Sequence, residues 1–482
     1  MLDTRPILLA HGVLLSLLAA VMLLPMLLDL AVGNEDWKVF AASFFITGFS
    51  GGILFLTNRG YRGTLNIRQA FIFTTSTYVL LIIFAALPLY LSSDAIDVTD
   101  AFFESASGLT TTGSTVLSGL DAMPPGILLW RSLLNMMGGI GIVVLALAVL
   151  PMLRIGGMQL FRTESSDTNE KSLPRTTQIA SAIAMVFLVL TAICALCYRM
   201  AGMSGFDAIN HAMSTVATGG FSTHDASFAF FDNPLIEWIA VIFMMSGAVP
   251  LILYFQMVKG KPLVILRNTQ VQWLIVLIAA SVAMMVIWLV MMQDMRAMLA
   301  LRQVTFNIVS VVTTTGFAST DYMQWGIFPV VLFFMLTVVG GCTGSTSGGI
   351  KIFRLQILYY TTTAQIKRLI QPHGVFVPRY NGKPISEEVA ASVMTFIVLF
   401  GISFTVIAMV LSLYGLDFLT CMSAAAQALA NVGPGLGDVI GPAGNYATFP
   451  DGAKWLLSFA MIMGRLELFT VLVLLAPSFW RD

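Results

Sequence analysis

The chain consists mainly of long apolar runs separated by short polar segments. Ten runs lie at 7–30, 38–57, 70–91, 127–153, 179–201, 235–258, 271–293, 328–340 continuing at 350–362, 389–414 and 455–477. A helix needs about 20 apolar residues to cross a bilayer, and most of these runs reach that length. Composition agrees, because 57% of the residues are hydrophobic and only 10% are charged, which is typical of polytopic membrane proteins. We expect an all-α membrane protein.

Four shorter, semi-polar segments lie between the members of the later pairs of runs, at 98–109, 206–215, 304–312 and 418–429. They are too short and too polar to cross a bilayer. Each leads directly into a short loop, T-T-T-G at 110–113, V-A-T-G-G at 216–220, T-T-T-G-F at 313–317 and A-N-V-G-P at 430–434. The pattern predicts two N-terminal helices (1–66) and four helix, pore-loop, helix repeats in a pseudo-fourfold arrangement, at 67–160, 161–262, 263–372 and 373–482.

Basic residues gather in alternate connecting segments, and this bias predicts the topology. With the N-terminus inside, the inner segments hold Arg5, Arg59, Arg62, Arg68, Arg154, Arg162, Lys171, Arg175, Lys259, Lys261, Arg267, Lys351, Arg354, Lys367, Arg368, Arg379, Lys383 and Arg481. Both termini are then cytoplasmic, and the half-helices enter from outside. Acidic residues predominate in the outer segments, which would concentrate cations there, although solvated outer loops are commonly acidic without such a role.

The four loops predict a cation path. Irregular backbone at membrane depth persists only where protein buries it or where it lines a watery cavity. Carbonyl groups aimed at a common axis can replace the hydration shell of a cation, and Gly113, Gly219, Gly316 and Gly433 suit this close approach. No Asp or Glu lies in the loops, which disfavours Ca²⁺. Neutral carbonyls and threonine hydroxyls favour a large monovalent cation, with K⁺ as the default.

Five longer motifs carry a resemblance to a known family: D-A-F-F-E-S-A-S-G-L-T-T-T-G at 100–113, G-G-F-S-T-H-D-A-S at 219–227, G-G-C-T-G-S-T-S-G-G at 340–349, N-V-G-P-G-L-G at 431–437 and G-R-L-E-L-F-T at 464–470. The whole chain resembles the membrane subunit, of the Trk type, of the Trk/Ktr/HKT superfamily of potassium transporters. The resemblance implies K⁺ uptake across the bacterial inner membrane, with no cofactor bound by this chain. It also implies that K⁺ is bound by the filter residues Thr111, Thr112, Gly113, Thr218, Gly219, Thr315, Gly316, Asn431, Val432 and Gly433.

The resemblance implies the ion selectivity but leaves the subfamily open. Sodium-preferring relatives have serine at the position of Gly113, so the glycine here implies a preference for K⁺. In contrast, S-G-A-V-P at 246–250 replaces an Asn-plus-aromatic pattern that is frequent in similar proteins. The subfamily, and any coupling of K⁺ to H⁺ or Na⁺, therefore stays open.

The glycine-rich stretch at 340–349 interrupts the second helix of the third repeat. Because glycine disfavours helix, a flexible segment is expected just inside the filter. The resemblance implies an intramembrane gating loop whose flexibility comes from Gly340, Gly341, Gly344, Gly348 and Gly349. A plain helix kink is an alternative, whereas a phosphate-binding loop would need a G-K-[ST] ending that is missing here.

Arg465 is a charge inside a predicted membrane helix, which marks a functional site by default. The resemblance places it in the pore below the filter, where a fixed positive charge would gate or slow cations. A buried ion pair with another helix is the alternative. Glu467 would lie roughly 200° around the same helix, so the two side chains are not expected to pair.

Other functions and partners complete the expectations. An ion-coupled secondary transporter is the runner-up, but four repeats of one orientation favour a central pore over an inverted-repeat site. No catalytic motif occurs, so an intramembrane enzyme is not expected.

Similar proteins are homodimers on a cytosolic ring of TrkA-type subunits that bind NAD or ATP. The basic segments at 154–175 and 351–383 could dock that ring or could simply set the topology.

Overall fold

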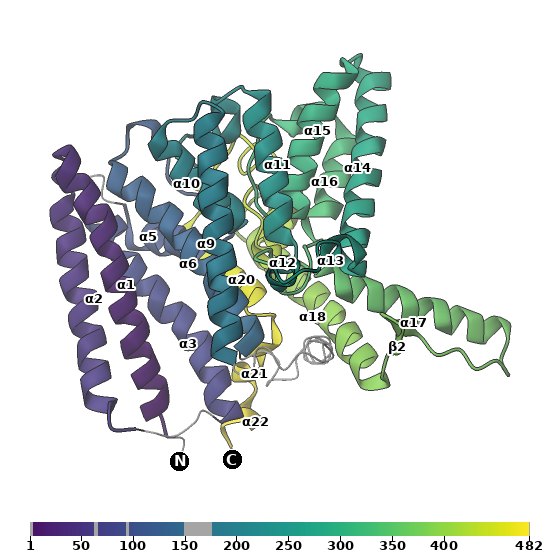
Figure 1. The fold of residues 1–482 in the computed structure, drawn as a ribbon, viewed down its shortest axis with the longest axis horizontal. Helices are drawn as coiled ribbons and strands as arrows, with labels where there is room; N and C mark the ends of the chain where they lie inside the picture. Colours follow the sequence, from purple (N-terminus) through teal and green to yellow (C-terminus); the bar gives the residue numbers. More distant parts are fainter. Residues whose placement is uncertain (1–2, 62–65, 93–95, 149–175, 482) are drawn as a thin grey trace.

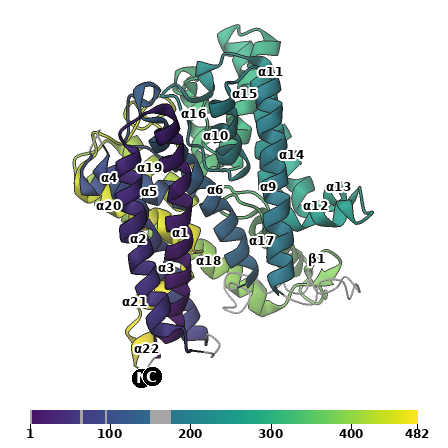
Figure 2. The same cartoon turned by 60° about the vertical axis from the view of Figure 1, so that its left-hand side comes forward.

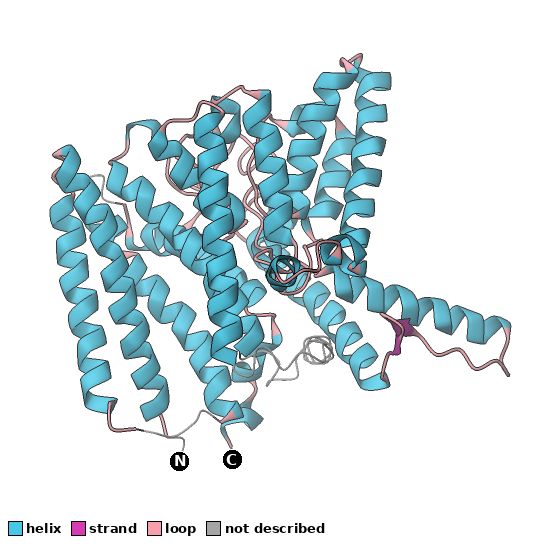
Figure 3. Cartoon of the chain, viewed as in Figure 1, coloured by secondary structure: helices cyan, strands magenta, loops and turns pink. Residues whose placement is uncertain are grey.

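A computed structural model describes residues 3–61, 66–92, 96–148 and 176–481 and is almost entirely helical (Figures 1 and 3). Within these residues, the regular strands are two short segments that pair antiparallel, β1 (Arg379–Tyr380) and β2 (Lys383–Pro384). In the described part of the chain, seven helices are long and apolar enough to cross a membrane, or nine if each of two bent pairs is one span. The all-α, multi-pass prediction is confirmed.

The long helices coincide with the predicted runs. They are α1 (Arg5–Val32), α2 (Trp37–Asn58), α3 (Ile67–Ala85) followed by α4 (Leu87–Leu91), α6 (Pro125–Ala148), α9 (Thr176–Met200), α14 (Thr269–Gln293) and α18 (Glu387–Ser412). α1 and α2 stand side by side at one flank of the bundle, and both chain termini lie at the same end (Figures 1 and 2).

Four half-helices occupy the predicted positions: α5 (Val98–Leu109), α10 (Gly205–Val216), α15 (Ala297–Val312) and α19 (Phe418–Ala430). α15 begins earlier than the predicted residue 304, because A-M-L-A-L-R-Q at 297–303 is rich in strong helix formers. In α19, small side chains such as Ala424, Ala425 and Ala428 are completely buried, so neighbouring backbones can approach closely.

Two predicted spans are not continuous. The run 235–258 forms α11 (Pro234–Ala248) and α12 (Leu251–Val258), bent by 95°, and 455–477 forms α20 (Asp451–Arg465) and α21 (Phe469–Leu475), bent by 117°. Pro250 disfavours the helical conformation of the residue before it, and Val249 is extended. Glu467 and Leu468 have φ of 64° and 45°. Neither break is visible in the hydropathy pattern, because each bent pair taken together is still apolar enough for one span.

The third repeat is interrupted as predicted, because α16 (Ile327–Thr337) and α17 (Ile352–Ile370) flank the glycine-rich stretch. α17 then extends away from the bundle (Figure 1). The remaining elements are short: α13 (Val264–Arg267), α22 (Pro477–Trp480) and the 3₁₀ turns η1 (Leu120–Ala122), η2 (Ser227–Phe230) and η3 (Tyr322–Trp325).

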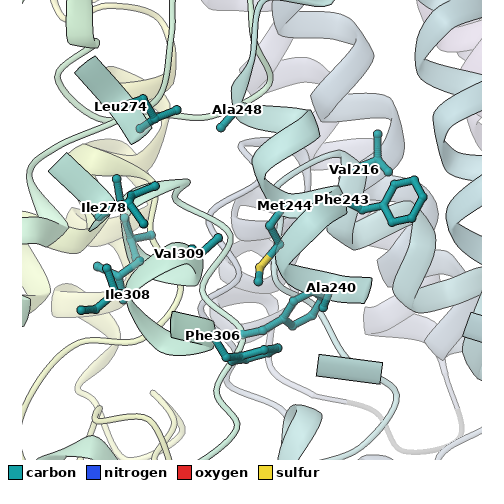
Figure 4. Close-up of a cluster of buried hydrophobic side chains, with 14 of the residues drawn as sticks. Val216, Ala240, Phe243, Met244, Ala248, Leu274, Ile278, Phe306, Ile308 and Val309 are labelled. Carbon is teal, nitrogen blue, oxygen red and sulfur yellow. The ribbon is translucent and has the colours of Figure 1, made fainter. Parts of the chain in front are cut away.

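Two apolar cores surround the half-helices. One joins mainly the second and third repeats and the other mainly the N-terminal helices with the first and fourth repeats. In Figure 4, the side chain of Met244 of α11 points toward Phe306 of α15, and both residues are completely buried. Since the half-helices are enclosed in this way, the loops that follow them run through the middle of the bundle (Figure 3).

Candidate functional site: a ring of four loops and an inner barrier

The four loops begin with the same backbone turn. After each half-helix, one amide donates a hydrogen bond to a carbonyl oxygen five residues earlier: Thr112 to Ser107 (2.8 Å), Gly219 to Ser214 (2.8 Å), Thr315 to Ser310 (2.8 Å) and Val432 to Gln427 (3.0 Å). The preceding residues Thr111, Thr218, Thr314 and Asn431 all have left-handed φ, between 51° and 61°. Such strained conformations of non-glycine residues persist where the surroundings enforce them and are common at functional sites.

This pattern corrects the register of the second loop. The sequence pattern pairs Gly219 with Gly113 as equivalent filter glycines. In the structure, however, the amide of Gly219 makes the hydrogen bond that the amide of Thr112 makes in the first loop. Gly220 instead takes the place of Gly113, since their φ values are 76° and 87°. The error arose because the second loop contains two consecutive glycines, and the sequence alone does not show which one follows the strained residue.

The glycines bring the loops into a closed ring. A Cβ atom on Gly113 would lie 2.5 Å from the carbonyl oxygen of Gly219, and one on Gly220 would lie 2.0 Å from that of Thr315. The contacts continue from Gly316 to Gly433, and from Gly433 back to Gly113. Each loop therefore touches the next in chain order, and the fourth touches the first. Side chains at Gly113 or Gly220 would be excluded by both space and backbone conformation.

Helix polarity favours a cation at this ring. All four loops follow the C-terminal ends of half-helices, whose aligned peptide dipoles carry partial negative charge there. On one side of the ring, a cavity of 170 Å³ is lined by glycines of all four loops, by Arg131 of α6, and by His224 and Asp225 from the segment after the second loop. The ring thus has an open, polar entrance.

A buried ion pair behind the loops was missed by the sequence analysis. Arg131 on α6 donates to Glu104 on α5 (Nε to Oε1, 2.8 Å) and to the carbonyl oxygen of Ser222 (2.8 Å), and Glu104 accepts from the amide of Val116 (2.9 Å). Both charged side chains are almost completely buried. They therefore join the first half-helix to the segments that follow the first and second loops. The sequence does hint at this pair, because Glu104 and Arg131 both lie in segments predicted for membrane depth, where a charge needs a partner.

Asn431 connects the fourth loop to the first. Its side-chain amide donates to Thr112 Oγ1 (3.0 Å) and to the carbonyl oxygen of Met461 (2.9 Å), while Ser114 donates to the carbonyl oxygen of Gly433 (2.9 Å). Asparagine tolerates the left-handed conformation better than most residues. The fourth loop therefore departs from the T-T-G sequence while keeping its backbone shape.

The glycine-rich stretch 340–349 lies directly against the strained residues of the ring. The amide of Gly348 donates to Thr314 Oγ1 (2.7 Å), and the hydroxyls of Thr346 and Thr218 are 3.2 Å apart. Thr346 Oγ1 also lies 3.0 Å from the carbonyl oxygen of Val216, at the C-terminal end of α10. The stretch is therefore a folded loop packed beneath the ring, and a plain helix kink does not describe it.

The break between α11 and α12 holds this loop. The amide of Cys342 donates to the carbonyl oxygen of Ala248 (2.9 Å), that of Thr346 to Gly247 (3.1 Å), and that of Leu251 to Gly344 (3.0 Å). The unusual S-G-A-V-P sequence at 246–250 thus supplies exposed backbone groups that a continuous helix would use internally.

Arg465 reaches the same loop from the end of α20. Its guanidinium donates to the carbonyl oxygens of Thr346 (2.8 Å) and Gly138 (3.2 Å), and its side chain is buried. The expectation that Glu467 continues the same helix is wrong, because the chain turns there; Glu467 pairs with Arg354 on α17. Among the described residues, Arg465 forms no ion pair with a carboxylate, so the buried ion-pair alternative finds no support.

Histidines have local roles here. His211 lies 2.9 Å from Ser222 Oγ and 2.9 Å from the carbonyl oxygen of Asp207, and His224 bridges Asp121 and Asp207. Among the residues that the structure describes, no group of three His, Cys, Asp or Glu side chains could hold a metal ion.

A closed ring of neutral loops at the ends of four half-helices, inside a bundle of membrane-spanning helices, defines a membrane cation transporter. Sequence comparison agrees: the TrkH family, described as a cation transport protein, matches residues 36–481. The chain belongs to this family.

Named relatives extend over the whole chain. The Trk system potassium uptake protein TrkI of Halomonas elongata is 46% identical over 478 residues, covering 99% of this chain and 97% of the relative. The Trk system potassium uptake protein TrkH of Salmonella typhimurium is 38% identical, covering 98% of each chain. The crystal structure of the potassium transporter TrkH from Vibrio parahaemolyticus covers 100% of both chains with a TM-score of 0.92 and 36% identity.

Proposed function

We infer that this chain takes up K⁺ across the membrane. The observation that carries this conclusion is the closed ring of four loops, which offer backbone carbonyls and threonine hydroxyls and contain no Asp or Glu. Such groups suit a weakly hydrated monovalent cation. The relatives named above are potassium uptake proteins by their names, and the family is one of transport proteins, not enzymes.

The ring is the proposed selectivity filter. K⁺ would exchange its hydration shell for oxygens of the filter residues predicted above, and the hydrogen-bond register adds Gly220 and Thr314 to that set. The proposed path enters through the cavity beside Asp225. Four parallel repeats around one ring favour a channel-like path over an ion-coupled transporter with an inverted-repeat site.

Ion flux into vesicles tests this function. Purified protein in liposomes should carry K⁺ and Rb⁺ in preference to Na⁺ down an imposed gradient, measured with an ion-sensitive dye or tracer. A control without protein sets the leak. The absence of monovalent cation flux, even when the loop 340–349 is shortened to exclude a closed gate, would contradict the proposal.

The loop 340–349 is the proposed gate, closed in this conformation. It is held by hydrogen bonds to Thr218 and Thr314 of the filter, to the α11–α12 break and to Arg465. Opening requires these bonds to break together. Its glycines, at positions 340, 341, 344, 348 and 349, permit the backbone change that opening needs.

Thr346→Val should loosen this gate. Valine has nearly the shape of threonine but lacks the hydroxyl that contacts Thr218, Val216 and Gly247. A hydrogen bond contributes about 1 kcal/mol net, so basal K⁺ flux should rise several-fold. Thr363→Val, on the cytoplasmic extension of α17, is the matched control and should leave flux unchanged. Equal flux from native protein and Thr346→Val would show that this hydroxyl does not hold the gate.

For assembly, we propose a homodimer on a cytosolic TrkA-type ring that binds NAD or ATP. The outer part of α17 and the segment after it expose apolar side chains beyond the bundle, including Ile366 (52% exposed), Leu369 (74%) and Val375 (90%), which favours a protein contact here. The basic segment 154–175 lies outside the described residues. Cross-linking of cysteine pairs placed at Leu369 should yield a dimer; a monomer under all conditions would contradict it.

The proposed location is the bacterial inner membrane, with both termini cytoplasmic. The observation that both termini lie at one end of the bundle supports this (Figure 1). The division into two N-terminal helices and four repeats, with the boundaries predicted above, is likewise proposed.

A further inference from the structure

The segment α12–α13 is an unusual surface element, distinct from the ring and from the path. α12 is bent by 95° from α11, so it runs across the bundle, and with α13 it stands out from the side of the molecule (Figure 2). α11 and α14 are both membrane helices, and the segment joins them at the end that the charge pattern assigns to the cytoplasm. The predicted topology therefore places it along the inner membrane surface.

Apolar and basic side chains alternate on this segment. Val258, Leu263 and Leu266 are 81%, 51% and 60% exposed. Between them stand Lys259 and Lys261, and Arg267 follows; these three residues are exposed as well. No acidic residue occurs between Glu237 and Asp294. Exposed apolar side chains interleaved with bases, without acids, fit a membrane surface carrying negative charge.

The same segment is bonded to the loop beneath the ring. Leu251, the first residue of α12, donates its amide to Gly344 (3.0 Å). Gly247 and Ala248, just before the break, accept from Thr346 and Cys342. Any displacement of α12 relative to the bundle therefore acts on backbone groups that hold the loop.

We propose that α12–α13 binds the head-group phosphates of anionic phospholipids, and that this binding holds the loop 340–349 in its closed position. The basic side chains extend to the head groups while their stems and the neighbouring apolar residues rest on the acyl chains. With α12 fixed at the membrane surface, the carbonyl oxygens of Gly247 and Ala248 stay in place for the loop. The second half of the proposal rests on the gating role of the loop.

Lipid binding and flux test the two halves separately. The full chain and the triple variant Lys259→Gln, Lys261→Gln, Arg267→Gln are purified and exchanged into phosphatidylcholine alone or an equal mixture with phosphatidylglycerol. Native mass spectrometry should show phosphatidylglycerol retained by the native chain and lost by the variant. Each base near an anionic surface contributes about fivefold in affinity, so three should account for roughly a hundredfold. Lys367→Gln with Arg368→Gln, on α17, is the control and should keep the lipid.

K⁺ flux is then compared in the same two kinds of vesicle. Flux of the native chain should be several-fold lower in vesicles that contain phosphatidylglycerol. Flux of the triple variant should be the same in both kinds of vesicle. Equal lipid retention by native chain and variant would overturn the proposed site. Retention without a change in flux would overturn the coupling, and suppression of flux by inorganic phosphate in phosphatidylcholine vesicles would show a site for soluble anions instead. If no vesicle shows K⁺ flux, the proposed transport fails while lipid retention still decides the site.

Discussion

Gly113→Ser is expected to abolish most discrimination between K⁺ and Na⁺. Gly113 has φ of 87°, and a Cβ atom there would lie 2.5 Å from the carbonyl oxygen of Gly219. A side chain in such a conformation costs about 1–3 kcal/mol, and the neighbouring carbonyl must also move. Since a change of about 1.4 kcal/mol alters a binding ratio tenfold, the K⁺ to Na⁺ flux ratio should fall by tenfold or more.

Gly119→Ser is the matched control for this measurement. Gly119 has a similar φ of 75°, but apart from its two chain neighbours no residue comes within 4 Å of the position of its Cβ. The control therefore carries the same backbone penalty outside the ring, and its flux ratio should equal that of the native chain. If both variants keep the native ratio, the ring formed by Gly113 does not select the ion.

Removing the side chain in Arg465→Ala should raise K⁺ flux by tenfold or more. The guanidinium donates to Thr346 and Gly138, and a hydrogen bond from a charged group contributes about 1.5–3 kcal/mol. Without these bonds the loop loses its contact with α20, and the positive charge beside the proposed path disappears. The flux should be measured in vesicles without any cytosolic subunit, so that only this chain sets the rate.

Two further variants make the result specific. Arg368→Ala removes the same side chain from an exposed site on α17, where it donates to Phe376, and should leave flux unchanged. Arg465→Lys keeps the charge but cannot reach both carbonyl oxygens; high flux in this variant would assign the effect to the hydrogen bonds, and low flux to the charge. Native flux in Arg465→Ala would refute the barrier.

The arrangement of helices was largely predictable from the sequence, because a bilayer requires helices of a certain length and hydrophobicity. The half-helix α5 was predicted with its observed bounds, since its short semi-polar segment had no other place in a bilayer. The loop 340–349 was likewise visible, because its glycines interrupt an apolar run. In both cases a local property of the chain decides the structure.

The features that the sequence did not reveal depend on contacts between distant segments. The turn at Glu467 and Leu468 has no proline or glycine, and it is fixed by partners such as Arg354 on another helix. The register of the second loop depends on which of Gly219 and Gly220 meets the third loop. The pair of Glu104 and Arg131 required the folded chain to place two charges together.

The ring and the loop beneath it differ in symmetry, and this difference bears on how the proposed gate would open. Four half-helices are followed by nearly equivalent turns in the ring, but the loop 340–349, the proposed gate, comes from a single place in the chain. That loop is fastened to the second repeat through Gly247 and Ala248 and to the fourth through Arg465. Under the gating role proposed above, the release of this one segment from its neighbours opens the whole path, so conduction should switch between two levels instead of rising through intermediate steps.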